Sequence, residues 1–323
     1  MGTMKYVALI LVFLAVVLFG VSQLTKPEII LYTSEEVANT TKQTTLIFVG
    51  DMMFDRYIRQ VTHNKNYTSV LSSIKPVLLA SDGVIGNLEG PITTNPSVSI
   101  ETRSPQKNHF TFTFDQAVAT LLKENNFLAV SLGNNHILNF GKEGVAKTTA
   151  FLTSSNIGYF GVPSGKRSTI ITSNDILFGL VAYNAFIDTS IDGAVSEIKK
   201  ISPVVDWLIV YPHWGNEYEK TPSALQVNQA HAFIDAGADM VVGAHPHVIQ
   251  TKELYKEKFI YYSLGNFVFD QYFNEDVRCG LLLQTTFTKI NDTTMVDIEE
   301  FTTYLNTDAS TVYKKCGSIV KTP

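Results

Sequence analysis

Two histidines, His245 and His247, stand one residue apart directly after an apolar run with the character of a buried strand, Met240 to Gly243. In a parallel α/β sheet, ligands gather at the carboxyl ends of the strands, where the chain leaves the core for a loop. Two neutral imidazoles held at such a point are well suited to a divalent transition metal. A His-x-His pair alone is a modest signal, because many such pairs are simply surface residues.

Four other apolar runs end in side chains of the same kind. They deliver Asp51 after 46–50, Glu89 after 83–88, the triplet Asn134, Asn135 and His136 after 127–133, and His213 after 207–212. Because the carboxyl ends of parallel strands meet at one edge of a sheet, we expect all these side chains to form one site with the two later histidines.

The chemistry that fits this set is that of a two-metal hydrolytic site. Such sites hold ions roughly 3.5–4 Å apart, bridged by a carboxylate and by a water whose pKa they lower. Glu89 is the expected bridge, and His136 is expected to donate a proton to a leaving oxygen or to bind a substrate anion. Carboxylate, amide and imidazole ligands together suit Mn, Zn or Fe better than Ca or Mg, so two divalent transition-metal ions are the predicted cofactors. The predicted metal ligands are Asp51, Glu89, Asn135, His213, His245 and His247.

Each residue also has a simpler explanation. Asp51 and Glu89 alone are compatible with helix caps or loop carboxylates, Asn134 and Asn135 with a turn, and His213 with a strand-end histidine stacked on a tryptophan. We assign His63, His109 and His231 to ordinary structural roles. The coincidence of five strand ends favours the metal site.

The elements that must position these residues alternate between strands and helices, which is typical of βαβ units and a largely parallel sheet with helices outside. The late segments lack intervening helices, so part of the sheet is predicted to be antiparallel, and the fold class is α/β with mixed β-sheets flanked by helices. Helices are expected over 70–80, 115–124, 141–154 and 223–235. Strands are expected over 46–50, 83–88, 127–132, twice within 170–183, and over 208–211, 240–243, 259–264 and 281–287, with one or two peripheral strands within 295–304.

The bulk composition sets broad limits. A chain of 323 residues with 45% hydrophobic content can bury a sizeable core in one large or two small domains. The net charge of −5 argues against a nucleic-acid partner, which would call for a basic face.

The first 25 residues contain an uncharged, strongly apolar run from Tyr6 to about Val21. A spanning helix needs roughly 20 apolar residues and a signal-peptide core about 7–15, so this run falls between the two. We expect 1–25 to be a membrane anchor that leaves the rest of the chain outside the cytoplasm, with cleavage and secretion as the alternative. Residues 26–44 are the expected tether.

The only two cysteines are Cys279 and Cys316. Outside the cytoplasm they could form a disulfide, and two free buried thiols are equally compatible with the sequence.

Six motifs in order give this chain a resemblance to a known family. They are Val49–Met53, Asn87–Glu89, Asn134–His136 with Gly141 downstream, His213–Tyr218, Gly237–Asp239 leading to Gly243–Gln250, and Tyr262–Gln271. The chain resembles the CapA family of poly-γ-glutamate capsule synthesis proteins, whose domain is similar to the calcineurin-type metallophosphoesterase fold. The resemblance covers about 46–287, so we expect a CapA-like domain over 45–290 and a C-terminal extension over 291–323.

The resemblance implies metal-ligand positions for the six predicted ligands and the catalytic position for His136. It also implies that Arg56, Asn134 and Asn266 contact an anionic substrate. Two residues depart from the pattern. Met53 stands where the phosphoesterase pattern has a histidine, and a thioether is a poor ligand for a hard ion. Asn139 stands where CapA-like sequences often carry an aspartate.

Two functions of different class follow as hypotheses. The first is an extracytoplasmic, metal-dependent hydrolase or transferase that acts on an anionic polymer or phosphoester during capsule or cell-envelope polymer synthesis. The second is a non-catalytic, polyanion-binding subunit of a synthesis and export complex, with membrane-bound synthase subunits as partners. A phosphodiesterase unconnected with capsule rests on fold analogy alone.

Overall fold

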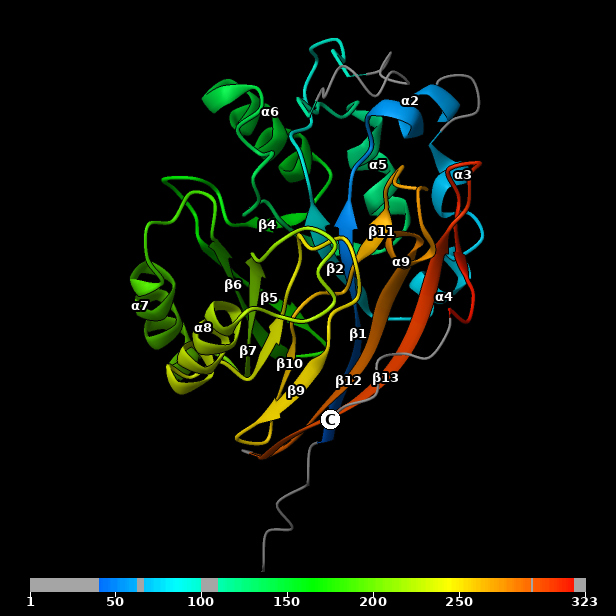
Figure 1. Cartoon of the computed structure of the whole chain (residues 1–323). Coiled ribbons are helices and arrows are strands. Elements are labelled where there is room, and N and C mark those ends of the chain that lie inside the picture. Colours follow the sequence, from blue (N-terminus) through cyan, green and yellow to red (C-terminus); the bar gives the residue numbers. More distant parts are fainter. Residues whose placement is uncertain (1–40, 63–66, 100–109, 292, 317–323) are drawn as a thin grey trace, which may run out of the picture. The chain divides into compact units, whose positions relative to one another are not determined.

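The structure is a computed structural model that describes residues 41–62, 67–99, 110–291 and 293–316 (Figure 1). These residues belong to one compact unit, Thr40–Pro323. The predicted anchor over 1–25 and nearly all of the predicted tether lie outside the described residues, as do His63 and His109. Within the described ranges no helix is long and apolar enough to cross a membrane.

The first of two mixed β-sheets has the order β14-β13-β12-β1-β2-β3-β4, with β11 paired to the end of β1. Strands β1 to β4 run parallel, whereas β12, β13 and β14 are antiparallel to their neighbours. The strands are β1 (Thr41–Met52), β2 (Gly83–Leu88), β3 (Phe127–Ser131), β4 (Gly158–Phe160), β11 (Asn266–Val268), β12 (Cys279–Ile290), β13 (Thr293–Leu305) and β14 (Thr311–Tyr313).

The second sheet has the order β5-β6-β7-β8-β10-β9. Its inner strands are parallel, and its two edge strands, β5 and β9, are antiparallel to their neighbours. The strands are β5 (Ser168–Ser173), β6 (Ile176–Asn184), β7 (Trp207–His213), β8 (Met240–Val242), β9 (Lys252–Tyr255) and β10 (Lys258–Tyr261). The prediction of mixed sheets with antiparallel late strands is confirmed.

Successive side chains of a strand point to opposite faces of its sheet, so one strand contributes to two separate hydrophobic cores. On β1, Ile47 and Val49 join the helices outside the first sheet, while Leu46 and Phe48 join a core shared with the second sheet. Helices α7 and α8 cover the outer face of the second sheet (Figure 1). The helices are α2 (Arg56–Thr62), α3 (Thr68–Leu71), α4 (Lys75–Leu79), α5 (Ala117–Glu124) and α6 (Gly141–Ser154) on the first sheet, and α7 (Asp192–Ile201) and α8 (Ala224–Asp235) on the second, with a short η1 (Ser202–Val204) and α9 (Glu275–Arg278) in connections. This helix–sheet–sheet–helix arrangement agrees with the metallophosphoesterase-type fold that the resemblance implies.

Some predicted elements need correction. The helix expected over 70–80 is two short helices, α3 and α4, because Pro76 lies in the first turn of α4 and has no N–H to continue an earlier helix. The sequence pattern did not indicate α2, α7, β4 or β9. The helix expected over 223–235 is confirmed as α8: Ser223 and Gln226 form a capping box at its start, and Gly237 follows its end with φ of 116°.

The two cysteines form a disulfide between Cys279 and Cys316. This resolves the alternative that the sequence leaves open, and it ties the last described residue of the tail to the start of β12.

Replacing both cysteines by serine is expected to lower the free energy of unfolding by about 2–4 kcal/mol, because the bond closes a loop of 37 residues in the unfolded chain. Urea denaturation of wild-type protein and the Cys279→Ser/Cys316→Ser variant measures the difference. Wild-type protein treated with a reductant should match the variant, and equal stability of oxidised and reduced protein would contradict the prediction.

Near the end of β1, the backbone at Gly50 lies very close to the backbone at Gly265, just before β11. A Cβ on Gly50 would lie 1.8 Å from the carbonyl oxygen of Gly265, so only glycine fits here. The Asp51 N–H donates to that same carbonyl at 3.0 Å. Strand β11 is thereby placed beside the end of β1, where the predicted ligands lie.

Candidate metal centre

In each of the two sheets, strand register places predicted site residues next to one another. In the first sheet Asp51 is paired with Asn266 on one side and with Asn87 on the other. In the second sheet His213 is paired with Asn184 and, through an isolated bridge, with Ala244. The next residue after Ala244 is His245, so the carboxyl ends of both sheets supply side chains to one place.

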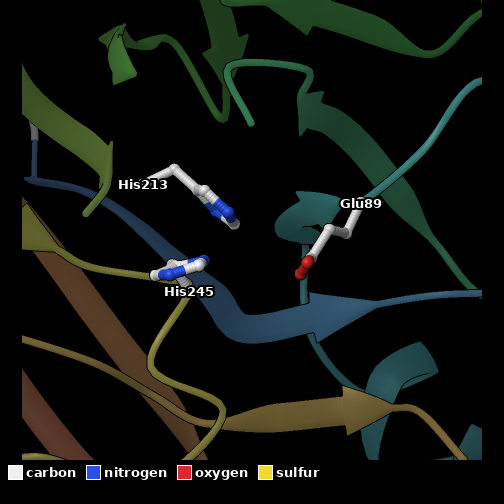
Figure 2. A group of neighbouring side chains, drawn as sticks. All are labelled: Glu89, His213 and His245. Atoms are coloured by element: carbon white, nitrogen blue, oxygen red, sulfur yellow. The ribbon is translucent and has the colours of Figure 1, made fainter. Parts of the chain in front are cut away.

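Two groups of buried side chains there can each hold a metal ion. The first contains Glu89, His213 and His245, and the second contains Asp51, Glu89 and His247. In each group the ligand atoms lie within 4.8 Å of one another. Figure 2 shows the Glu89 carboxylate pointing across from the first sheet toward the imidazoles of His213 and His245. Glu89 belongs to both groups, so it occupies the position of a bridging carboxylate.

Glu89 is fully buried, yet neither of its oxygens has a hydrogen-bond partner among the described residues. Its nearest cationic candidates are the Nε2 atoms of His247 at 3.7 Å and His136 at 3.9 Å. Burial, followed by the negative charge of Asp51, raises the pKa of Glu89 well above its usual value. An unpartnered buried carboxylate is costly in a folded protein unless a cation meets it.

Asp51, by contrast, is firmly held. Its Oδ1 accepts from the Asn87 amide at 2.7 Å, and its Oδ2 accepts from the His245 backbone N–H at 3.0 Å. Burial by itself would raise the pKa of Asp51, but the hydrogen bond and charge of His247, 3.3 Å away, lower it below the usual range. Asp51 is therefore a permanent carboxylate at the centre of the site.

His213 and His245 are neutral, and His213 is positioned by its neighbours. His213 Nε2 lies 3.0 Å from Asn135 Oδ1, and its Nδ1 lies 3.2 Å from the Asn87 amide nitrogen. Burial, followed by the charge of His245, lowers the pKa of His213 well below its usual value. Burial and the charge of His247 lower the pKa of His245 to about 3. Neutral imidazoles are the form that binds metal.

The backbone of the His245-Pro246-His247 turn is strained. His245 has φ of 98° and His247 has φ of 58°, values that residues with a Cβ rarely adopt. The His245 Nδ1 atom also lacks a hydrogen-bond partner among the described residues. Strain of this kind persists where the surrounding structure over-determines it, and it concentrates at functional sites.

His136 lies at the edge of the group. Its ring packs on Phe112 with centroids 4.3 Å apart, and its Nδ1 lies 3.4 Å from the amide nitrogen of Asn139. Burial, followed by the charge of His247, lowers the pKa of His136 to about 4. Because the Asn139 amide is a donor, Nδ1 is the acceptor, and the ring proton resides on Nε2, which faces Glu89.

The three residues predicted to contact substrate are engaged within the protein. Asn134 is buried; its amide donates to Asn87 and to the Leu88 carbonyl. Asn266 Oδ1 accepts from His247 Nδ1 at 2.9 Å, and the Asn266 amide nitrogen contacts three further acceptors. Arg56 forms an ion pair with Asp270 and lies over the ring of Phe112. All three surround the centre, and substrate contact by them stays a prediction.

Met53 turns away from the centre. Its side chain is fully buried in the helix-facing core, and its sulfur accepts from the Asp55 backbone N–H at 3.0 Å. The departure from the phosphoesterase pattern at this position therefore leaves one fewer protein ligand for an ion at Asp51, Glu89 and His247.

The sequence interpretation did not assign roles to three residues that the structure brings to the centre. Asn87 links Asp51 to His213, as described above. Asn184 ends β6 and donates to the Asn134 carbonyl at 2.9 Å. The ring of Phe186 lies 4.4 Å from that of His245. Asn184 follows an apolar strand, so the rule that found the other strand ends applies to it, whereas no signal in the sequence marks Phe186.

The donor set fits divalent transition metals. Two carboxylates, an amide oxygen and neutral imidazoles are ligands that such ions accept, and the unpartnered oxygens of Glu89 supply the place that an ion would fill.

Comparison with known proteins agrees with this picture. The profile of the family "Bacterial capsule synthesis protein PGA_cap" matches residues 45–271. A capsule biosynthesis protein CapA from Bacillus anthracis is 29% identical over 321 residues, covering 92% of this chain and 77% of that protein. A PGA biosynthesis protein CapA from Bacillus subtilis is 32% identical over 283 residues, covering 79% of this chain and 72% of that protein.

Among solved structures, a hypothetical protein from Thermus thermophilus has a TM-score of 0.51 and 16% identity, and the match covers 80% of this chain and 98% of that one. This likeness concerns the fold alone. The matched family region contains the whole candidate centre, from Asp51 to Asn266. With its motifs, fold and relatives in agreement, the chain belongs to the bacterial capsule synthesis protein family.

Proposed function

We propose that this protein acts in the synthesis of a poly-γ-glutamate capsule or a related cell-envelope polymer, through a dinuclear metal site that hydrolyses or transfers an anionic substrate. The names of its relatives support the setting. The observation that carries the chemistry is Glu89, a fully buried carboxylate without hydrogen-bond partners among the described residues, shared by two groups of metal-type ligands.

In this proposal one divalent ion is held by Asp51, Glu89 and His247, and the other by Glu89, Asn135, His213 and His245. Bound ions supply Lewis acidity toward a phosphoryl or acyl oxygen and attract an anionic group. Asn87 and Asn266 hold the ligands in place: Asn87 fixes Asp51 and His213, and Asn266 fixes His247. Groups that orient metal ligands in this way commonly change metal affinity by about 10–100-fold when they are removed.

His136 is the proposed proton donor. Its Nε2–H faces the carboxylate that both metal groups share, which is where a leaving oxygen would lie. Asn139 cannot offer the negative charge that would stabilise a protonated imidazole, and the charge of Arg56, which lies over Phe112, opposes that form, so the imidazolium that donates the proton would form beside the negative charge of a bound substrate.

The setting of this activity is part of the proposal. The apolar run within 1–25 would anchor the protein to the cell membrane, with the compact unit outside the cytoplasm and membrane-bound polymer synthase subunits as partners. A disulfide in the folded unit supports an oxidising compartment.

The second candidate is a non-catalytic subunit that holds polyanion through the same metals. The low pKa of His136 and the absence of a ligand at Met53 favour this alternative, because both weaken the case for hydrolysis.

The two candidates are separated by incubating full-length protein and Mn²⁺ with poly-γ-glutamate and, separately, with aryl phosphoesters. We expect wild-type protein to cleave one of these substrates and His136→Ala to lose at least about 100-fold in rate while binding the substrate within about twofold. His231→Ala is the matched control, since His231 pairs with Glu253 on the outer face and should keep full activity. Polymer binding without cleavage in both wild type and His136→Ala would favour the binding subunit.

A further inference from the structure

A small pocket lies beside the candidate metal centre, at the carboxyl ends of β3, β4 and β6; we call it the side pocket. It is lined by Gly133, by the loop 161–165, by Arg167 and by four residues between 182 and 188. Its volume is about 130 Å³, whereas a water molecule takes roughly 30 Å³ in the liquid. The side pocket therefore admits a group of several non-hydrogen atoms.

The side pocket adjoins the metal centre. Asn184, which lines the pocket, is the register partner of His213 on the neighbouring strand, and adjacent strands lie about 4.8 Å apart. The Asn184 amide donates to the Asn134 carbonyl at 2.9 Å. Gly133, which also lines the pocket, directly precedes Asn134 and Asn135 in the chain. Asn135 Oδ1 lies 3.0 Å from His213 Nε2, so a ligand at the metal group that contains His213 has the side pocket next to it.

Backbone contacts fix the shape of the side pocket. A Cβ on Gly161 would lie 2.5 Å from the Gly133 backbone nitrogen and 2.7 Å from the Ala182 Cβ. The ends of β3, β4 and β6 can therefore meet here only because residue 161 is glycine. The loop after β4 closes with a hydrogen bond from the Gly161 N–H to the Arg167 carbonyl at 3.1 Å, which also holds Arg167 in the lining of the pocket.

Arg167 gives the side pocket its hydrogen-bond donors. Its Nη1 and Nη2 each donate to a carboxylate oxygen of Asp188 at 2.8 Å, and Nη1 also donates to the Ala182 carbonyl at 3.3 Å. A guanidinium has five N–H donors, so two of those of Arg167 have no partner among the described residues. Ser164 also lines the pocket and carries a hydroxyl. Donors of this kind fit a group with oxygen acceptors, such as a carboxylate or an amide carbonyl.

Charge indicates how such a group would be held. Asp188 balances the charge of Arg167, and the other residues that line the pocket are uncharged. The side pocket therefore does not collect free anions, and its ligand must have a second point of attachment. The neighbouring metal centre supplies one, because two divalent ions would bring four positive charges against the two carboxylates of Asp51 and Glu89.

A chain of γ-linked glutamate matches the two sites together. Each residue of such a chain carries one carboxylate and one amide carbonyl, and ordinary bond lengths place successive residues roughly 6 Å apart. The spacing of neighbouring strands, about 4.8 Å, puts Asn184 at a similar distance from His213. A residue held at the metals would therefore place the next residue of the chain at the side pocket.

We infer that the side pocket binds the glutamyl residue next to the one held at the metals, and that Arg167 donates to the oxygen acceptors of that residue. This inference rests on the proposed function. It narrows the substrate from an anionic group to a chain of at least two linked residues.

The test compares glutamate with γ-glutamyl-glutamate, each in the L and the D form, as ligands of full-length, Mn²⁺-loaded protein in calorimetry. Wild-type protein is expected to bind the dimer of one form about tenfold tighter than the monomer, because only the dimer reaches Arg167. Ile187→Trp puts a larger side chain into the lining of the pocket and should reduce this preference to about twofold, with monomer affinity within about twofold of wild type. Ile170→Trp, at an exposed isoleucine on β5 outside the pocket, is the matched control and should keep the preference.

Arg167→Lys is the second variant, because lysine can still pair with Asp188 but lacks the forked donors of arginine. It should reduce the preference for the dimer about threefold. Equal wild-type affinity for monomer and dimer, or an unchanged preference in Ile187→Trp with its metal content intact, would overturn the role of the side pocket and leave the proposed function standing. If Ile187→Trp loses its metal, Arg167→Lys decides, and an unchanged preference there overturns the inference.

Failure of wild-type protein to bind the dimer in either form would also overturn the inference. Binding of poly-γ-glutamate by the same protein would then leave the proposed function standing. Failure to bind the polymer as well would overturn polyglutamate as the substrate of the proposed function.

Discussion

The His245→Ala/His247→Ala variant is expected to retain far less divalent transition metal than wild-type protein, which should carry about two ions per chain when purified without chelator. The two imidazoles serve different groups: His245 lies with Glu89 and His213, and His247 with Asp51 and Glu89. Removing both takes a nitrogen ligand from each ion, so affinity should fall at least about 100-fold. Elemental analysis of the purified proteins measures the result.

His231→Ala is the control for a general effect of histidine removal. His231 stacks on Tyr255 at 3.7 Å and pairs with Glu253 on the outer face of the second sheet, so its loss should not change metal content. Circular dichroism must show that the double variant is folded. Equal metal content in the double variant and wild type would exclude these residues as ligands. A wild-type value of one ion would indicate that the group containing His247, which lacks a ligand at Met53, binds weakly.

Glu89→Gln is expected to stabilise the protein in chelator and to destabilise it, relative to wild type, in Mn²⁺. Without metal, the buried carboxylate has no hydrogen-bond partner among the described residues and lies near the charge of Asp51, so a neutral amide of similar size should gain about 1–3 kcal/mol in free energy of unfolding at pH 7.5. With metal, only wild-type protein gains the free energy of binding two ions through a shared carboxylate.

The stability difference between Glu89→Gln and wild type in chelator is expected to depend on pH. The pKa of Glu89 is raised by folding, so the unfolded chain releases this proton near 4.5 while the folded protein keeps it. Wild-type stability in chelator therefore falls as pH rises above about 4.5, and Glu89→Gln escapes this loss. The advantage of the variant should be small at pH 5 and larger at pH 7.5.

The histidines change the stability of both proteins with pH in the direction opposite to that of Glu89. The pKa values of His136 and His245 are lowered to about 4 and about 3, so below pH 6.5 the unfolded chain takes up protons that the folded protein does not. Both chelated proteins should lose stability as pH falls below 6.5, and their difference isolates Glu89. Urea denaturation at pH 5 and 7.5, with chelator or Mn²⁺, measures all four conditions.

Glu253→Gln is the matched control, because Glu253 already has partners in His231 and Tyr262 and should gain nothing from neutralisation. A chelated Glu89→Gln protein that is less stable than wild type at pH 7.5 would show that Glu89 has stabilising partners of its own. The argument for an ion at this carboxylate would then fail.

Much of the fold was predictable from local pattern. Apolar runs gave most strands, including 127–132 and 240–243, and capping signals gave the helix that begins after Ser223. Two elements were missed for different reasons. Helix α7 was not anticipated although its buried Ala194, Ile198 and Ile201 recur at helical spacing, whereas β4 has only three residues, Gly158–Phe160. A strand as short as β4 is stabilised by its neighbours rather than by its own propensity.

The candidate site was predictable to a similar degree. The rule that polar residues at the carboxyl ends of strands gather at one edge brought together Asp51, Glu89, His213 and His245, and their ligand-type atoms do lie together. The rule identified the site residues and the edge of the sheet where they lie, but it did not identify their hydrogen-bond partners. That Asn134 and Asn266 would be occupied by internal hydrogen bonds could not be inferred from their types.

By itself, the sequence determined the chemistry available to this protein: which carboxylates, amides and imidazoles stand at the ends of strands, and which family their motifs match. Those properties are local, because apolar periodicity and strand ends depend on residues close together in the chain.

Only the tertiary structure decided which of these groups face one another. Asp51 meets the His245 N–H across 194 positions of sequence, β11 lies beside β1 because Gly50 admits the Gly265 carbonyl, and Phe186 stands over the ligand imidazoles. Such contacts are set by strand order, register and the packing of two sheets, which join segments far apart in the chain. Side-chain type and periodicity do not specify them, and for that reason the unpartnered state of Glu89 among the described residues and the side pocket emerge only in the folded molecule.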